Sequence, residues 1–251
     1  EASYETALRG TPGVRQLEVD ARGRIVRDLG VVKAATPGKT VVLTIDLDAQ
    51  RQATDALEWG LKPAKRKRIH TFLSTSPVHM KYKLQKEPHE VYEMVIAQVT
   101  RARSHTDNVE WSAEDGTRTE FDFLCRCVDA AIKAGATTIN IPDTVGYTTP
   151  DEYFSLFKRL IEAVPNSDKA VFSTHCHNDL GMAVANSLAG VRGGARQIEC
   201  TVNGIGERAG NAALEEIVMA IKTRNDVFPW STGIEATMLT RASKLVSAAT
   251  S

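Results

Sequence analysis

The sequence lacks the features that mark membrane, secreted and nucleic-acid-binding proteins. No apolar run in its 251 residues approaches the length of a membrane span, and the first residues show neither the basic nor the apolar region of a signal peptide. Lysine and arginine together number 31, as do aspartate and glutamate, so no net charge attracts nucleic acid or an anionic membrane. We therefore expect a cytoplasmic protein with no nucleic-acid or membrane partner.

Cysteines are also few. Cys125, Cys127, Cys176 and Cys200 form no CxxC pair, and four cysteines do not make a disulfide framework for a chain of this size. We expect reduced thiols that serve mostly as packing residues. The chain is long enough to bury a substantial core, either as one barrel or as two modest domains.

The first 60 residues have a pattern of their own. Residues 14–19 and 24–26 flank a polar turn that ends in glycine, Asp20-Ala21-Arg22-Gly23, and this arrangement predicts a β-hairpin. Residues 40–45 then predict a strand and residues 49–57 a helix. The stretch from about residue 4 to 58 resembles the segment that precedes the transpeptidase domain of class B penicillin-binding proteins. We therefore expect one domain over residues 1–60 and a second over 61–251.

From residue 69 onward a strand followed by an amphipathic helix repeats five times. The strands are expected at residues 69–74, 108–111, 137–141, 170–172 and 197–201. Regular βα units predict parallel strands with right-handed crossovers. The predicted fold is therefore α/β, an incomplete TIM-type (β/α) barrel with about five βα units, preceded by the small hairpin, strand and helix segment.

Polar side chains gather where these strands end, which is where βα barrels carry their chemistry. His175 and His177 lie two residues apart, so they would project from one face and could share a metal ion. The alternative is a pair of polar loop residues. For Asn211, we expect a helix N-cap whose side chain also faces the site. The other strand ends offer further candidates, namely His70, Ser112, Glu114, Asn140 and Thr144.

These strand ends also carry a resemblance to a known family. Residues 74–80, 110–119, 140–147 and 204–211 are similar to the 2-isopropylmalate synthase family, and the resemblance extends over residues 61–224. It implies a homo-oligomeric acyltransferase that condenses acetyl-CoA with the 2-oxo acid 2-oxoisovalerate in leucine biosynthesis, assisted by Mn, Mg or Zn. It also implies the roles of the candidates: His175, His177 and Asn211 as metal ligands, Glu114 and His70 as catalytic residues, and Thr144, Ser112 and Asn140 as substrate-binding residues.

One part of the family pattern is missing. The first barrel strand of that family ends in Asp-Thr-Thr-Leu-Arg-Asp-Gly-Glu-Gln, which supplies a metal-binding aspartate and a catalytic arginine, and this sequence contains no such motif. We therefore expect weak metal binding and little synthase activity. Two alternatives stay open: a homocitrate or citramalate synthase with the same metal site, and a non-catalytic hybrid module related to cell-wall transpeptidases.

Overall fold

The computed structural model of the chain describes residues 11, 14–19, 25–34, 61 and 63–250. The chain divides into two compact units, Glu1–Lys62 and Pro63–Ser251. The resemblance of residues 4–58 to penicillin-binding proteins stays a prediction, and the strand and helix predicted at 40–45 and 49–57 lie outside the described residues.

The described part of the first unit is an antiparallel hairpin, as predicted. Strand β1 (Val14–Val19) pairs with β2 (Ile25–Lys33), which is longer than predicted because the β-branched pattern continues to Val32. The pair is held by main-chain bonds and by an ion pair of 2.5 Å between Arg15 Nη2 and Asp28 Oδ2. Its apolar side chains are exposed in the described residues, so the hairpin by itself has no core.

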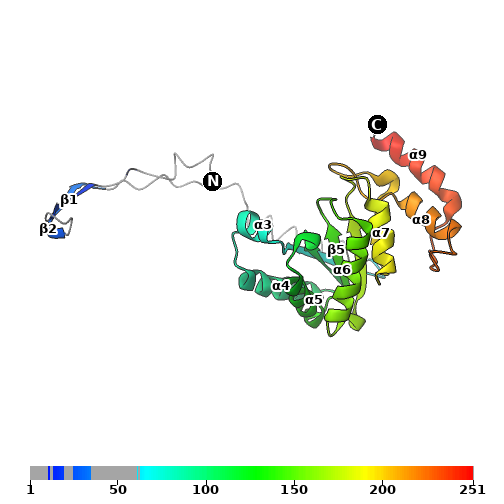
Figure 1. Cartoon of the computed structure of the whole chain (residues 1–251), viewed down its shortest axis with the longest axis horizontal. Helices are drawn as coiled ribbons and strands as arrows, with labels where there is room; N and C mark the ends of the chain where they lie inside the picture. Colours follow the sequence, from blue (N-terminus) through cyan, green and yellow to red (C-terminus); the bar gives the residue numbers. More distant parts are fainter. Residues whose placement is uncertain (1–10, 12–13, 20–24, 35–60, 62, 251) are drawn as a thin grey trace. The chain divides into compact units, whose positions relative to one another are not determined.

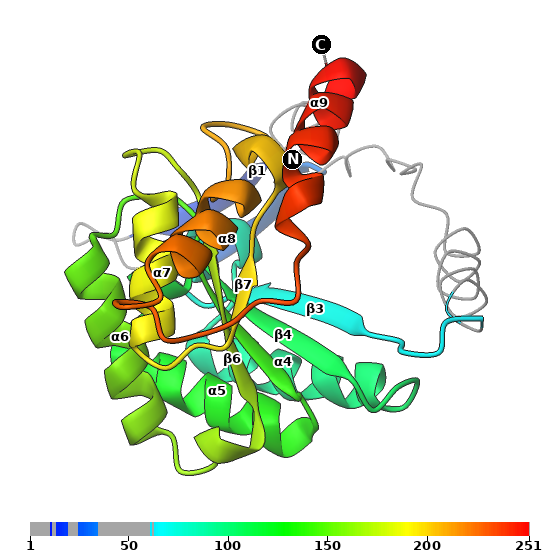
Figure 2. The same ribbon diagram turned by 90° about the vertical axis from the view of Figure 1, so that its right-hand side faces the viewer.

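The second unit contains a five-stranded parallel sheet, which confirms the prediction of repeated βα units (Figures 1 and 2). Its strands are in sequence order: β3 (Ile69–Ser74), β4 (Val109–Glu114), β5 (Thr138–Asp143), β6 (Val171–Cys176) and β7 (Gln197–Glu199). Among the described residues, β3 and β7 are the two edges. The order is that of a partial barrel, in which each strand neighbours the next.

Long helices follow the strands. They are α4 (Pro88–Arg103), α5 (Phe121–Ala134), α6 (Pro150–Ala163), α7 (Ala183–Arg192), α8 (Leu214–Thr223) and α9 (Leu239–Thr250). Short turns lie between them: α3 (Pro77–His79), the π-helix η2 (Met80–Leu84), and the 3₁₀ turns η3 (Gly116–Arg118), η4 (Ser167–Lys169), η5 (Val202–Gly204) and η6 (Ala236–Met238). Within the described part of the chain, no helix has the length and apolar character to cross a membrane.

Local sequence sets the helix ends. Thr149 and Glu152 form a capping box at the start of α6, with Pro150 at its first position. Helix α5 ends at Gly135, whose φ of 113° is the left-handed conformation that glycine adopts without strain. A Cβ there would lie 2.8 Å from Cγ of Arg103. Gly135 is therefore the C-cap of α5, and α7 ends at Gly193.

The two faces of the sheet differ in character. Side chains that face the helices are apolar and form the core, for example Trp111, Ile139 and Phe172. Burying a large apolar side chain stabilises the fold by about 1.5–3 kcal/mol. Alternate residues of the same strands face the other way and are mostly polar, for example Ser112 and Asn140. The inner face of the sheet therefore holds the side chains available for chemistry.

Candidate functional site

A cavity of about 420 Å³ lies at the carboxyl ends of the parallel strands. It is lined by all eight side chains predicted from the sequence, together with four others: His70, Phe72, Ser112, Glu114, Asn140, Pro142, Thr144, His175, His177, Glu199, Glu207 and Asn211. A larger cavity of about 500 Å³ lies against α8, but its lining is mainly apolar. The polar side chains that could carry chemistry therefore line the smaller cavity.

The two histidines of β6 and the loop after it point their rings at one another. Their Nε2 atoms are 3.2 Å apart, and the rings meet edge to face with centroids 5.0 Å apart. The Nδ1 atom of His177 is 2.7 Å from the carbonyl oxygen of Thr144 and 3.1 Å from Nη2 of Arg208. The Nδ1 atom of His175 lies 3.4 Å from Oε2 of Glu199. The two Nε2 atoms therefore face one another, while each Nδ1 atom lies near polar groups outside the pair.

Burial keeps His175 uncharged. Desolvation first, and then the nearness of His177, lowers the pKa of His175 to about 4. A neutral imidazole with a free Nε2 lone pair is the form that binds a metal ion.

Asn211 completes this group from the loop before α8. Its backbone forms an antiparallel bridge with His177, and its Nδ2 donates to the carbonyl of Ile205 over 2.9 Å. The Oδ1 atom of Asn211 is buried and has no hydrogen-bond partner. A buried oxygen without a donor suits a cation. The predicted N-cap role of Asn211 is wrong, because α8 begins at Leu214 and its N-cap is Ala213.

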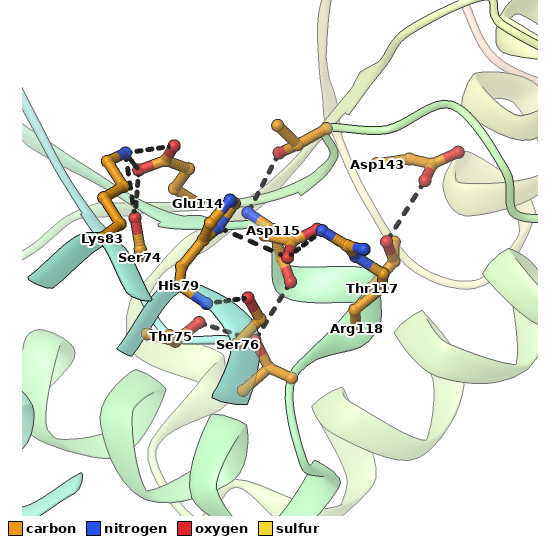
Figure 3. Close-up of polar contacts among 12 residues, drawn as sticks. Ser74, Thr75, Ser76, His79, Lys83, Glu114, Asp115, Thr117, Arg118 and Asp143 are labelled. Atoms are coloured by element: carbon orange, nitrogen blue, oxygen red, sulfur yellow. Dashed lines mark hydrogen bonds and ion pairs between the residues drawn. The ribbon is translucent and has the colours of Figure 1, made fainter. Parts of the chain in front are cut away.

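Glu114 enters the cavity from the end of β4 and is held from behind (Figure 3). Lys83 Nζ lies 2.6 and 2.7 Å from its two carboxylate oxygens, and the Ser74 hydroxyl also donates to it. Burial alone would raise the pKa of Glu114, but the hydrogen bonds from Lys83 and Ser74 outweigh burial and lower it. Glu114 is therefore an ionised acceptor.

The next residue, Asp115, points away from the cavity. Its φ of 62° is left-handed, and its fully buried carboxylate accepts two hydrogen bonds from Arg118, of 2.8 and 2.7 Å. His79 Nδ1 lies 3.4 Å from the same carboxylate. The Asp115 backbone N–H donates to the hydroxyl of Thr144 over 3.0 Å, which fixes that hydroxyl at the cavity.

Ser112 and Asn140 link two further side chains of the cavity, His70 and Glu199, which form its floor. Asn140 Nδ2 donates to the Ser112 hydroxyl over 2.9 Å and to Glu199 Oε2 over 3.1 Å. His70 Nε2 is 2.6 Å from the same hydroxyl. The Ser112 hydroxyl thus joins Asn140 and His70 in one hydrogen-bonded network.

A second group of ligand atoms lies on this floor. One ligand atom from each of His70, Glu110 and Glu199 comes within 4.8 Å of the others, so these side chains could hold a metal ion. Glu110 already accepts from Arg68 over 2.8 Å and from Gln197 over 2.8 Å. Burial first, and then the neighbouring Glu110 carboxylate, raises the pKa of Glu199 to about 8.

Sequence reasoning missed Glu199, Lys83 and Arg118. Glu199 stands opposite His175 in the register of β6 and β7, which follows only when the strand pairing is known. Lys83 and Arg118 come from irregular turns, where no periodicity predicts a direction. The charged residues at 110 and 114, the second and sixth positions of β4, were the available signal that one face of this strand is polar.

Known proteins resemble this chain in sequence and fold. A 2-isopropylmalate synthase of Rhodopseudomonas palustris (strain BisA53) is 78% identical over 192 residues, which cover 76% of this chain and 37% of that protein. Another, from strain TIE-1, is 73% identical over 203 residues and covers 81% and 39%. The match thus spans less than two fifths of these curated relatives.

The fold is that of lyases with known structures. The HMG-CoA lyase of Bacillus subtilis matches with a TM-score of 0.63 at 21% identity, covering 80% of this chain and 67% of that one. The hydroxymethylglutaryl-CoA lyase of Pseudomonas aeruginosa matches with a TM-score of 0.62 at 19% identity, covering 85% and 70%. The family model described as HMGL-like matches residues 12–246, and so runs across much of the predicted first domain. Because that match takes in most of the sequence, the chain belongs to the HMGL-like family.

Proposed function

We propose that this chain carries the central part of a site that condenses acetyl-CoA with a 2-oxo acid, 2-oxoisovalerate, as in 2-isopropylmalate synthase. The observation that supports this proposal most is the gathering of all eight predicted side chains around one cavity, in a chain 78% identical over 192 residues to that enzyme. Homo-oligomer formation and a cytoplasmic location stay predictions.

The metal ion implied by the family would be held by His175, His177 and Asn211. Their donor set fits a divalent ion of the Mn, Mg or Zn kind, because two imidazole Nε2 atoms face one another and the buried Asn211 Oδ1 has no donor. When bound, such an ion polarises a ketone carbonyl and stabilises the negative charge that develops on its oxygen.

The chain's own side chains bind and orient the two substrates. The Thr144 hydroxyl accepts from the Asp115 N–H, which leaves its own proton for the carboxylate of the oxo acid. Glu114 stays ionised at the rim and offers its cavity-facing lone pairs to a donor group of the substrate. His70 lines the cavity beside Ser112, where its imidazole can exchange a proton with the substrate. Ser112 and Asn140 fix the orientation of that imidazole.

Calorimetry with 2-oxoisovalerate, with and without Mn²⁺, tests the proposal, together with release of free thiol from acetyl-CoA. We expect binding of the oxo acid that requires the ion, and slow or no thiol release, because the aspartate and arginine of the missing motif are not in the sequence. Binding that ignores the ion, or that survives in a Thr144→Val variant, would overturn it. Val is nearly isosteric with Thr but lacks the hydroxyl that would bind the acid.

A panel of 2-oxo acids separates the proposed substrate from its alternatives. Tightest binding of 2-oxoglutarate would favour a homocitrate synthase, and tightest binding of pyruvate a citramalate synthase. Binding of none of the acids, with retained metal binding, would favour the non-catalytic module.

A further inference from the structure

Lys83 stands behind Glu114 and does not line the cavity. It comes from η2, the π-helical turn that follows β3 and α3. Its ammonium group contacts both Glu114 oxygens, at 2.6 and 2.7 Å, and the Ser74 hydroxyl at 3.2 Å (Figure 3). The Lys83 ammonium group therefore restrains both oxygens of the Glu114 carboxylate from the side away from the cavity.

We infer that Lys83 is a positioning residue, which holds the Glu114 carboxylate in one orientation at the cavity without touching the substrate. A carboxylate has about four acceptor positions on two oxygens. Lys83 and Ser74 occupy those on one side, so the remaining lone pairs are directed toward the cavity. The inference rests on the proposed function for what Glu114 does, but not for how Glu114 is held.

No other described cation can replace Lys83 at this carboxylate. Arg118 is the nearest candidate by sequence, but both of its hydrogen bonds go to Asp115. The left-handed backbone of Asp115 sends the two consecutive carboxylates in different directions, each to its own cation. The separation has a physical benefit, because two neighbouring carboxylates sharing one cation would repel one another.

The charges around Glu114 agree with this role. From η2, Lys83 lowers the pKa of Glu114, and from α3, His79 lowers it further, against the effect of burial. The Ser74 hydroxyl on β3 acts in the same direction. Asp115 is the acidic residue next to Glu114 in the sequence, and its charge is already paired with Arg118.

The π-helical turn η2 places Lys83 within reach of the Glu114 carboxylate. Met80 at the start of η2 is buried in the core, while Lys83 has a side chain that is 47% exposed. Isolated π turns are uncommon and occur often at functional sites, because the wider turn redirects a side chain. Here the redirected side chain is the one that contacts Glu114.

Carboxyl ¹³C NMR of the whole chain, without metal or substrate, tests the inference. The Glu114 resonance is assigned by its loss in Glu114→Gln, and its titration midpoint is then compared among variants. We expect Lys83→Met to shift the midpoint to higher pH and Lys83→Arg to keep it near that of the native chain. Lys83→Gln should behave like Lys83→Met and keeps a polar side chain on the half-exposed turn, in case the Met variant does not fold.

Lys86→Met is the matched control. Lys86 lies three residues away and forms an ion pair of the same length, 2.6 Å, with Glu90, away from the cavity. Its removal should leave the Glu114 midpoint in place. An unchanged midpoint in Lys83→Met and Lys83→Gln, or an equal shift in Lys86→Met, would overturn the inference. Because the titration needs no turnover, absence of synthase activity would count against the proposed function alone.

Discussion

Two groups of side chains on the inner face of the sheet could hold a metal ion, and they differ in what their ligand atoms already bind. In the upper group, the Nε2 atoms of His175 and His177 face one another over 3.2 Å, and the Asn211 Oδ1 has no donor. In the lower group, Glu110 accepts from Arg68 and Gln197, and His70 Nε2 contacts Ser112. The upper group thus lacks a partner that a cation would supply, while the lower group is largely satisfied by the protein.

Protonation separates the groups in the same way. The pKa of His175 is lowered to about 4 by burial, so its ring is neutral near pH 7 and ready to bind. The pKa of Glu199 is raised to about 8 by burial and by Glu110, so that carboxyl keeps its proton near pH 7. Proximity of ligand atoms therefore does not by itself identify the metal site. The protonation and the hydrogen-bond partners of each ligand atom distinguish the upper group from the lower group.

The largest expected effect comes from removing the upper histidines. The double variant His175→Ala, His177→Ala should lose more than about 100-fold in affinity for Mn²⁺, because changes behind a ligand alone typically cost 10–100-fold. His70→Ala, which removes the only imidazole of the lower group, should change the affinity by no more than a few-fold. Calorimetric titration of the three proteins with Mn²⁺ measures both effects.

The comparison between the groups would break if the two results were reversed. A greater loss in His70→Ala than in the double variant would place the ion on the lower group. Circular dichroism spectra of both variants control for loss of the fold, since His177 is buried.

A smaller effect is expected at Glu199, which belongs to the lower group and lies next to His175 of the upper group. Its Oε2 lies 3.4 Å from Nδ1 of His175, the position from which an acceptor oxygen orients a metal-binding imidazole. Glu199→Gln should weaken Mn²⁺ binding by about 10-fold. Glu110→Gln, which changes only the lower group, should weaken it less.

Equal losses in these two variants would mean that both carboxylates ligate the ion directly. A loss confined to Glu199→Gln sharpens the comparison, because it assigns this carboxylate to the upper group as a residue that positions His175.

The sequence could predict the strands, their order and the side chains at their ends, because periodicity and strand polarity determine them. Each of the eight candidates lines the same cavity for this reason. The sequence could not predict that Glu199 stands opposite His175. The register of β6 and β7 depends on how α7, the helix that connects them, packs on the sheet. The N-cap prediction at Asn211 failed because the chain forms a bridge with His177 there and starts α8 three residues later.

The smallest expected effect concerns the thiols beside the two groups. Cys176 lies between the histidines, and Cys200 follows Glu199. Burial raises the pKa of Cys176 to about 12 and that of Cys200 to about 11. A free thiol has a pKa near 8.5. The thiols of Cys176 and Cys200 are therefore less ionised in the native chain than in the unfolded chain. As the pH rises, Cys200 should form a thiolate before Cys176.

Alkylation with iodoacetamide between pH 8 and 10, followed by peptide mass spectrometry, measures this order. We expect slow labelling of the native chain at pH 8, fast labelling in guanidinium chloride, and Cys200 ahead of Cys176 as the pH rises. Half-buried Cys125 on α5, away from both groups, provides an internal reference. Fast labelling of Cys176 at pH 8 would contradict the burial of this thiol on the core side of β6, where its neighbours include Tyr153 and Ser187.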